Sequence, residues 1–302
     1  MTSVAAAGLF VLVLGACGGG DGGGAVITAD GSSTVGPFVT KAAEDFKAEQ
    51  NVDVTVGISG TGGGFERFCA GETDLSNASR PIDEKEQALC VDAGVEYTEV
   101  RVATDALTNV VNIANDWATC LTVDQLKSIW QPDSKISSWS QVDPSFPDVE
   151  LSLFGPGTDS GTFDYFTDVV NGEEGASRTD YSPNEDDNVI VQGVSGNSGG
   201  LGYFGFSYFE QNQSVLKALE VNGGSGCVAP SAEAAQDGSY APLSRPLYVY
   251  LKQASFDDNE DVRSFVEFML DNNASIAEAA QFVPLSDEQL AEEQSKLGEA
   301  TG

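Results

Sequence analysis

The stretch VDVTVGISGTGGGFERFCAGE, residues 52–72, contains a strand pattern, a glycine-rich turn and a helix pattern in direct succession. Apolar residues alternate with other residues from Val52 to Ile58, which predicts a β-strand. Phe65 and Phe68 then recur at the spacing of a helix face. A strand, a bare turn and a helix in this order are the unit from which parallel α/β sheets are built.

The same unit recurs elsewhere in the chain. AVITADG (25–31) precedes a helix pattern that runs to residue 50, and VELSLFGPG (149–157) precedes one over residues 159–172. Strands followed repeatedly by helices predict an α/β protein. Further helices are expected at 83–94, 122–130, 184–197, 231–236, 261–273 and 286–300, a strand at 73–78, and a strand with a turn at 201–209.

One long extended segment suggests that the chain forms two units. Residues 97–115 carry a continuous strand pattern, long enough to leave one sheet near residues 104–108 and enter another. RPLYVYLK, residues 245–252, is a strong strand pattern that would return the chain to the first sheet. We therefore expect two lobes joined by two crossovers, with residues 25–105 plus 245–302 in lobe I and 106–244 in lobe II.

The composition excludes several functions. A net charge of −33 argues against nucleic acid and anionic membrane surfaces as partners. The chain has no histidine, so a Ser-His-Asp set, a Cys-His set or histidine-bound zinc cannot form. No metal or other cofactor is expected. The acidity is consistent with a well-solvated surface in a saline setting.

The first 24 residues have the pattern of an export signal and a tether. Residues 1–16 are apolar, uncharged and too short to span a bilayer comfortably, and Cys17 is followed by GGGDGGG. This pattern resembles a bacterial lipoprotein signal, which implies lipid attachment at Cys17 and a flexible tether. A buried N-terminal helix with a chance cysteine is the competing interpretation.

The remaining cysteines suggest disulfides, because exported proteins fold in oxidising surroundings. Four cysteines allow three pairings. We favour Cys69–Cys90 and Cys120–Cys227, since each pair lies within one expected lobe. Free thiols or a metal site remain possible, whereas a Cys69–Cys227 link would contradict the lobe division.

Three loops between a strand and a helix are rich in Gly, Ser and Thr: GSSTVGPF (31–38), SGTGGGF (59–65) and GPGTDSGTF (155–163). The start of a helix leaves backbone N–H groups unpaired and carries a partial positive charge. Hydroxyls add donors, and glycine lets an oxyanion approach the backbone. Each loop alone could be only a helix cap. Together they predict a cage of neutral donors, and none of them has the pattern of a nucleotide P-loop or a serine-hydrolase elbow.

The segment SNASRPI, residues 76–82, offers a cation. Arg80 is one of 14 basic residues in the chain, and its forked guanidinium suits a tetrahedral oxyanion. Pro81 restricts the loop after it. A surface salt bridge is the competing interpretation of Arg80.

These segments together resemble the phosphate-binding proteins of bacterial phosphate ABC importers, over residues 26–285. The resemblance implies a two-lobed periplasmic-binding-protein-like fold of type II with phosphate in the interlobe cleft. Ser33 and Thr34 match the donors of the first loop. Thr61, with Ser59, matches the second, and Ser160, Gly161 and Thr162 match the third.

Two positions depart from the better-known branch of that family. Gly155, Pro156 and Gly157 stand where that branch has an arginine, and Ser79 stands where it has an aspartate. Arg80 is the natural replacement for the cation. Asp159 is our candidate acceptor for the proton that phosphate carries near neutral pH, although it could equally be a helix cap.

The sequence thus predicts a high-affinity, extracytoplasmic receptor for inorganic phosphate, lipid-anchored to the outer face of the membrane. We expect a monomer that delivers phosphate to the membrane subunits of an ABC importer and catalyses no reaction. The alternatives are a receptor for sulfate or molybdate, a phosphatase that uses Ser33 or Ser160, and a calcium-binding surface protein.

Overall fold

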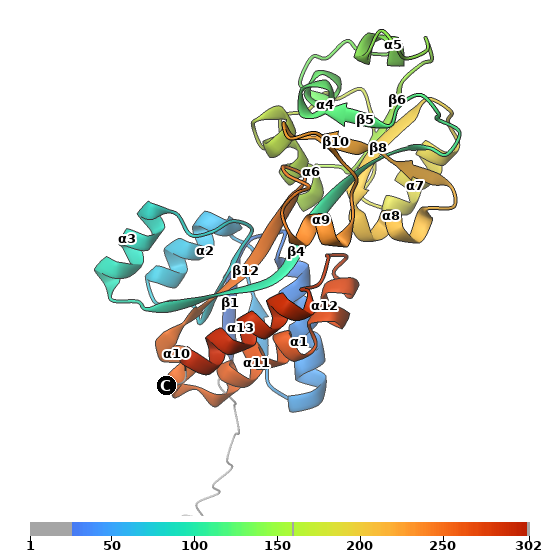
Figure 1. Ribbon diagram of the computed structural model, residues 1–302. Coiled ribbons are helices and arrows are strands. Elements are labelled where there is room, and N and C mark those ends of the chain that lie inside the picture. Colours follow the sequence, from blue (N-terminus) through green and yellow to red (C-terminus); the bar gives the residue numbers. More distant parts are fainter. Residues whose placement is uncertain (1–25, 159, 301–302) are drawn as a thin grey trace, which may run out of the picture.

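A computed structural model describes residues 26–158 and 160–300, which fold into two lobes joined by long strands (Figure 1). The main sheet has the strand order β2-β1-β3-β12-β4-β8-β6-β7, and β9 pairs with β4 beside this path. A separate sheet has the order β11-β10-β5. The expected α/β, two-lobed fold with two crossovers is confirmed.

Lobe I combines the first part of the chain with the last part. Its strands β1, β2 and β3 are parallel, as the predicted strand–helix units require, and β12 runs antiparallel to β3. Helices cover both faces of this part of the sheet, as Figure 1 shows. The elements are β1 (Ile27–Gly31), α1 (Gly36–Gln50), β2 (Val54–Val56), α2 (Gly60–Cys69), β3 (Leu75–Ala78), α3 (Glu84–Ala93), β12 (Ser244–Lys252), α10 (Gln253–Asp258), α11 (Glu260–Asp271), α12 (Asn273–Ala279) and α13 (Asp287–Ala300).

Lobe II is a single continuous part of the chain. Its sheet pairs β6 with β8 in parallel, and the smaller sheet lies beside α4. The elements that follow β4 (Tyr97–Asn112) are β5 (Cys120–Thr122), α4 (Val123–Trp130), α5 (Trp139–Val142), β6 (Ser152–Gly155), α6 (Gly161–Phe166), the π-helix η1 (Thr167–Asn171), β7 (Ser182–Pro183), α7 (Asp187–Ser195), β8 (Gly200–Gly205), α8 (Phe206–Asn212), β9 (Leu216–Ala218), β10 (Glu220–Asn222), β11 (Cys227–Val228) and α9 (Ala232–Gln236).

Strand β4 changes partners in the middle. Its residues from Tyr97 to Ala106 pair with β12, whereas Leu107 to Val111 pair with β8. This exchange falls inside the predicted crossing at 104–108. We propose that the lobe boundary lies here and where β12 begins.

Each lobe has its own apolar core. In lobe I the strand patterns and the helix faces of α1 and α11 meet in one cluster that includes Phe38, Val249 and Phe265, all fully buried. In lobe II the core is aromatic, because Trp130 packs edge-on against both Phe166 and Tyr203. The two large cores are therefore separate, and a smaller cluster that includes Phe206, Ala235 and Val283 packs where the lobes meet.

The glycine run at Gly62–Gly64 lies inside α2 rather than in the loop before it, because α2 begins at Gly60. The run has two different uses. A Cβ at Gly64 would lie 2.5 Å from the Cα of Gly31, so the helix can approach β1 only without a side chain there. Gly62 faces the interlobe space, and a Cβ there would meet only Glu86, at 3.8 Å.

Both favoured disulfides are present. Cys69–Cys90 joins α2 to α3, and Cys120–Cys227 joins β5 to β11 across 107 residues of sequence. Each bridge therefore lies within one lobe. Such links stabilise the fold mainly by restricting the unfolded chain.

Some elements differ from the sequence prediction. Residues 206–212 form helix α8, where a turn was expected, and the three-stranded sheet of β5, β10 and β11 was not predicted. The strands of that sheet have only two or three residues, too few to show an alternating pattern. The Gly94 helix stop is confirmed, with a left-handed φ of 70°.

Substitution of the two glycines is expected to change stability in opposite directions. Gly64→Ala should lower the free energy of unfolding by about 1–3 kcal/mol, because its Cβ would collide with the backbone of β1. Gly62→Ala should raise it by about 0.5–1 kcal/mol, because alanine favours the helix and has room. Chemical denaturation of both variants in phosphate-free buffer tests this, and equal effects would contradict the assignment of two uses.

Candidate functional site

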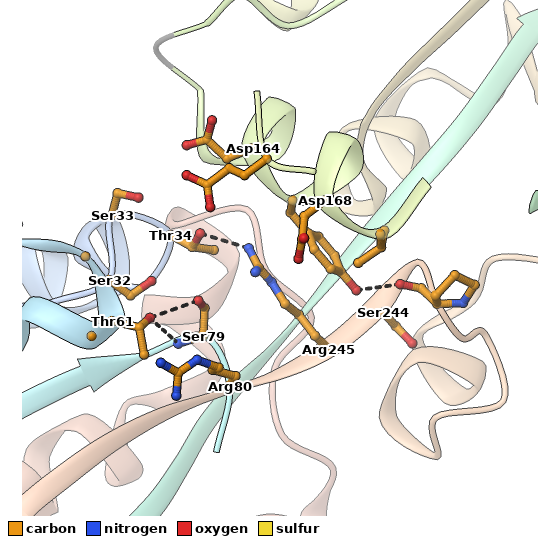
Figure 2. A pocket seen from close by; sticks show the side chains of 16 residues that line it. Ser32, Ser33, Thr34, Thr61, Ser79, Arg80, Asp164, Asp168, Ser244 and Arg245 are labelled. Carbon is orange, nitrogen blue, oxygen red and sulfur yellow. Dashed lines mark hydrogen bonds between the residues drawn. The ribbon is translucent and has the colours of Figure 1, made fainter. Parts of the chain in front are cut away.

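A cavity of about 590 Å³ lies between the lobes, where β12 begins (Figure 2). Its walls come from the strand–helix loops of lobe I, from α6 and η1 of lobe II, and from the start of β12. The first two donor loops and the segment of Ser79 and Arg80 therefore face a shared space. The lining residues are Ser32, Ser33, Thr34, Gly60, Thr61, Gly62, Ser79, Arg80, Asp164, Tyr165, Asp168, Val169, Glu174, Pro242, Ser244 and Arg245.

The loop between β1 and α1 presents unpaired donors. The carbonyl of Ser32 accepts from the N–H of Gly36, which closes the turn before the helix. The N–H groups of Ser33 and Thr34 donate to no other residue among those the structure describes. They stand at the positive end of the α1 dipole, where an anion is favoured.

The loop before α2 and the loop after β3 are joined by hydrogen bonds. The hydroxyl oxygens of Thr61 and Ser79 lie 3.1 Å apart, and the N–H of Ser79 donates to Thr61 Oγ1 over 3.3 Å. Both side chains face the cavity, as Figure 2 shows. This bond fixes the start of α2 against the end of β3 and keeps two hydroxyls side by side.

The buried side chain of Asp30 holds the loop before α2 in place. Its buried carboxylate accepts from the N–H groups of Gly31, at 2.7 Å, and Ser59, at 3.0 Å, and it pairs with Arg67. Burial acts to raise the pKa of Asp30, but the hydrogen bonds from Ser59, Gly31 and Arg67 outweigh it and lower the pKa overall. The N–H of Ser59 donates to Asp30 and is therefore not available to a ligand. Ser59 also lines neither interlobe cavity, so its role is to support the loop.

The third predicted loop comes from lobe II and meets the first. Ser160 caps α6 by accepting from the N–H of Thr162 over 3.2 Å. Ser160, Gly161 and Thr162 line a smaller cavity of about 190 Å³, whose walls also include Ser33 and Thr34. A Cβ at Gly161 would lie 3.2 Å from Thr34 Oγ1. A helix start of lobe II therefore lies beside the first donor loop of lobe I.

Arg80 faces the cavity but is held by a carboxylate. Its two terminal nitrogens each donate to one oxygen of Glu86 over 2.8 Å, and Glu86 itself accepts from the N–H of Asp83 in the capping box of α3. This pairing raises the pKa of the Arg80 guanidinium. The bidentate pair fixes the position of Arg80 and occupies part of its donor set.

A second guanidinium enters from the hinge. Arg245 lies opposite Asp105 in the β4–β12 ladder, and its Nε donates to Asp105 Oδ2 over 3.3 Å. Its Nη2 donates to Thr34 Oγ1 over 2.9 Å. The Cζ atom of its guanidinium lies 3.7 Å from the centroid of the Tyr165 ring, in a cation–π contact. Burial raises the pKa of Asp105, and Arg245 opposes that shift by favouring the carboxylate.

The lobe II wall of the cavity is acidic. Asp164, Asp168 and Glu174 line it, and Figure 2 shows Asp164 and Asp168 on the side of the cavity toward Arg245. Burial raises the pKa of Asp164, and the nearby Glu174 adds to the shift. The smaller cavity also contains Asp187, whose pKa is raised to about 6 by burial and by the neighbouring carboxylates of Asp186 and Glu185.

Comparison with known proteins identifies the family. Residues 19–273 match the PBP superfamily domain. The chain is 44% identical to the phosphate-binding protein PstS of Staphylococcus saprophyticus over 96% of this chain and 92% of that protein. The chain belongs to the PBP superfamily, in the family of the phosphate-binding protein PstS.

Two further relatives support this placement. Protein SphX of Synechocystis sp. is 46% identical over 87% of this chain and 79% of its own length. The crystal structure of a possible phosphate binding protein from Planctomyces limnophilus is 44% identical, with a TM-score of 0.87 over 92% of this chain and 99% of that one. The fold derived above is thus shared along almost the whole of a solved relative.

Most of the residues proposed from the sequence come together. Ser33, Thr34, Thr61, Ser79 and Arg80 line the larger cavity, and Ser160, Gly161 and Thr162 line the smaller one. Asp159 and the lipidation candidate Cys17 lie outside the described residues. The ligand-binding roles of all these residues stay predictions.

Sequence reasoning missed Arg245 and Asp105. A usable signal existed, since Arg245 is a rare cation at the start of the predicted returning strand, which is the argument that selected Arg80. Ser32 lies in the predicted first loop but was not named as a donor. Ser244 and the acidic wall were missed, because nothing local distinguishes them from other polar residues. No helix within residues 26–158 and 160–300 is long and apolar enough to cross a membrane.

The raised pKa of Asp187 predicts a pH-dependent stability. The folded protein binds the proton more tightly than the unfolded chain does, so Asp187 makes the free energy of unfolding rise as pH falls from about 6 to about 3.8. Asp187→Asn removes this penalty. It should therefore stabilise the protein at pH 7, by up to about 2 kcal/mol, and leave it almost unchanged near pH 4.

Denaturant titrations at both pH values test the prediction for Asp187. Asp143→Asn is a control of opposite sign, because hydrogen bonds from Ser145 lower the pKa of the exposed Asp143. That variant should lose stability at pH 7. An effect of Asp187→Asn that is the same at pH 4 and pH 7 would show that its carboxylate is not perturbed in the fold.

Proposed function

We propose that this protein is a high-affinity receptor for inorganic phosphate that delivers the ion to an ABC importer. Membership in the PstS family supports the class, since PstS of Staphylococcus saprophyticus is named a phosphate-binding protein and the Planctomyces limnophilus structure a possible one. The arrangement of donors between two lobes supports the binding mode. The ion would sit in the interlobe space and would be enclosed when the lobes move together.

The close approach of Gly161 to Thr34 carries the proposal. It brings a helix start of lobe II beside a helix start of lobe I, so one small anion can reach donors from both. Hydroxyls of Thr61 and Ser79 and the guanidinium of Arg80 face the adjoining larger cavity. We propose Ser33, Thr34, Thr61, Ser79, Arg80, Ser160, Gly161 and Thr162 as the residues around phosphate, with Ser59 in a supporting role.

Local donors can overcome the acidity of the chain. Hydrogen bonds to a charged group contribute about 1.5–3 kcal/mol each, and a micromolar site needs about 8 kcal/mol in total. A handful of such bonds would exceed that need and leave room for the cost of desolvation and closure. Salt screens the distant part of the net charge of −33 over about 8–10 Å, whereas the carboxylates of Asp164, Asp168 and Glu174 oppose an anion locally.

Phosphate near neutral pH carries a proton that sulfate lacks, so a carboxylate acceptor would favour phosphate. Asp159 is the candidate proposed from the sequence. Asp164 and Asp168 are carboxylates on the lobe II wall. They would repel sulfate, because sulfate has no proton to donate to them.

The position in the cell is part of the proposal. The pattern around Cys17 suggests a lipid anchor on the outer face of the membrane, and two disulfides suit an oxidising compartment. The partners would be the membrane subunits of an importer, which dock on the closed form of a monomeric receptor. We propose no catalysis, because Ser33 and Ser160 lack a histidine to activate them.

Isothermal titration calorimetry of the protein without its lipid tests the ligand. Phosphate is expected to bind with a Kd in the micromolar range or tighter, and sulfate and molybdate at least about 100-fold more weakly. Turnover of a chromogenic phosphate ester should stay at the level of the buffer. Tight sulfate or molybdate binding without phosphate binding would replace the proposed ligand by another oxyanion.

Substitution of Gly161 tests the geometry. Gly161→Val is expected to weaken phosphate binding at least about tenfold, because its side chain would push the α6 loop away from Thr34. Gly205→Ala is the matched control, since a Cβ at this interlobe glycine would be 3.7 Å from the carbonyl of Gln281, an ordinary contact. Unchanged affinity of Gly161→Val would mean that phosphate does not bridge these two loops.

A further inference from the structure

Arg245 touches both lobes and the hinge at once. Its guanidinium donates to Thr34 of lobe I, lies against Tyr165 of lobe II and pairs with Asp105 of strand β4. The side chain is 19% exposed, and this exposed part faces the larger interlobe cavity, as Figure 2 shows. Three contacts from three directions hold the guanidinium plane in one orientation.

The guanidinium has donors left over for a ligand. Of its five N–H groups, Nε donates to Asp105 and one from Nη2 donates to Thr34. Nη1 donates to no residue in the described part of the chain. Arg80 has fewer donors left, because its terminal nitrogens donate to both carboxylate oxygens of Glu86 and to the carbonyl of Pro81.

Thr34 extends the reach of Arg245. Its Oγ1 accepts from Arg245 Nη2, so its own hydroxyl proton remains available to another acceptor. This hydroxyl lies where Gly161 of lobe II comes nearest to lobe I. A charged donor behind a hydroxyl polarises it and strengthens the bond that the hydroxyl makes in turn.

We propose that Arg245, held in place by Asp105 and Tyr165, is the principal cationic contact to the bound oxyanion, directly through Nη1 and indirectly through the hydroxyl of Thr34. This inference rests on the proposed function. Arg80 contributes less, because its bidentate pair with Glu86 at 2.8 Å is tighter than the single 3.3 Å bond from Arg245 to Asp105. The cationic contact therefore comes from Arg245 at the start of β12. The bound anion is thereby linked to the strand pair that joins the two lobes.

The affinity of three variants for inorganic phosphate tests the assignment, again by calorimetry. Arg245→Met is expected to weaken binding about 100-fold, and Arg80→Met clearly less, by about tenfold. Removal of Arg245 alone leaves Asp105 buried without a partner, which would lower stability for reasons unrelated to the ligand. The double variant Arg245→Met/Asp105→Asn removes both charges, and it should recover the melting temperature without recovering the affinity.

Each result decides between the possibilities. A loss of less than tenfold in the folded double variant would overturn the assignment of Arg245, and so would a loss in Arg80→Met as large as in Arg245→Met. The wild-type titration separates this inference from the proposed function. If the wild type binds sulfate or molybdate in place of phosphate, the ligand is wrong, and the same variants measured with that anion still decide the role of Arg245. If it binds none of the three, both proposals fail.

Discussion

The antiparallel ladder between β4 and β12 is the constraint on which the two-lobed architecture depends. Strand β4 runs from one lobe into the other, and it exchanges β12 for β8 at Ala106 and Leu107. Because the backbone of β4 is bonded along this whole length, neither lobe can shift along the strand without breaking hydrogen bonds. Rotation about the exchange remains the easier motion, and the interlobe cavity lies beside it.

The position of the ladder also determines which charges meet in the cleft. Asp105 and Arg245 are register partners in it, so the side chains are paired by the backbone and not by chance proximity. Arg245 then reaches Thr34 on one side and Tyr165 on the other. Burying an ion pair costs desolvation free energy, so the pair of Arg245 and Asp105 adds little to the stability of the fold. A role of the cation in binding an anion explains its position better than a stabilising role does.

The glycines of α2 have two functions: one allows close packing on the sheet, and others leave room for a ligand at the start of the helix. Gly64 lets α2 press against β1, while Gly60 and Gly62 leave the start of the helix open to the cavity. Asp30 adds rigidity below, through hydrogen bonds to the backbone of Gly31 and Ser59. The donors at this edge are therefore held in place before any anion arrives, which lowers the cost of ordering them on binding.

The amino-acid sequence by itself determined the α/β class, the crossing near residues 104–108 and the three donor loops, because each depends on local periodicity or on short chain segments. It favoured the observed disulfide partners only through the expected lobe division, because four cysteines allow three pairings. Only the tertiary structure decided that Ser59 is engaged by Asp30, that Glu86 occupies Arg80, and that Arg245 enters the cleft. Those contacts join residues up to 211 positions apart in the chain. Their physical cause is the register of β4 against β12 and the packing of helix against sheet, which no local pattern specifies.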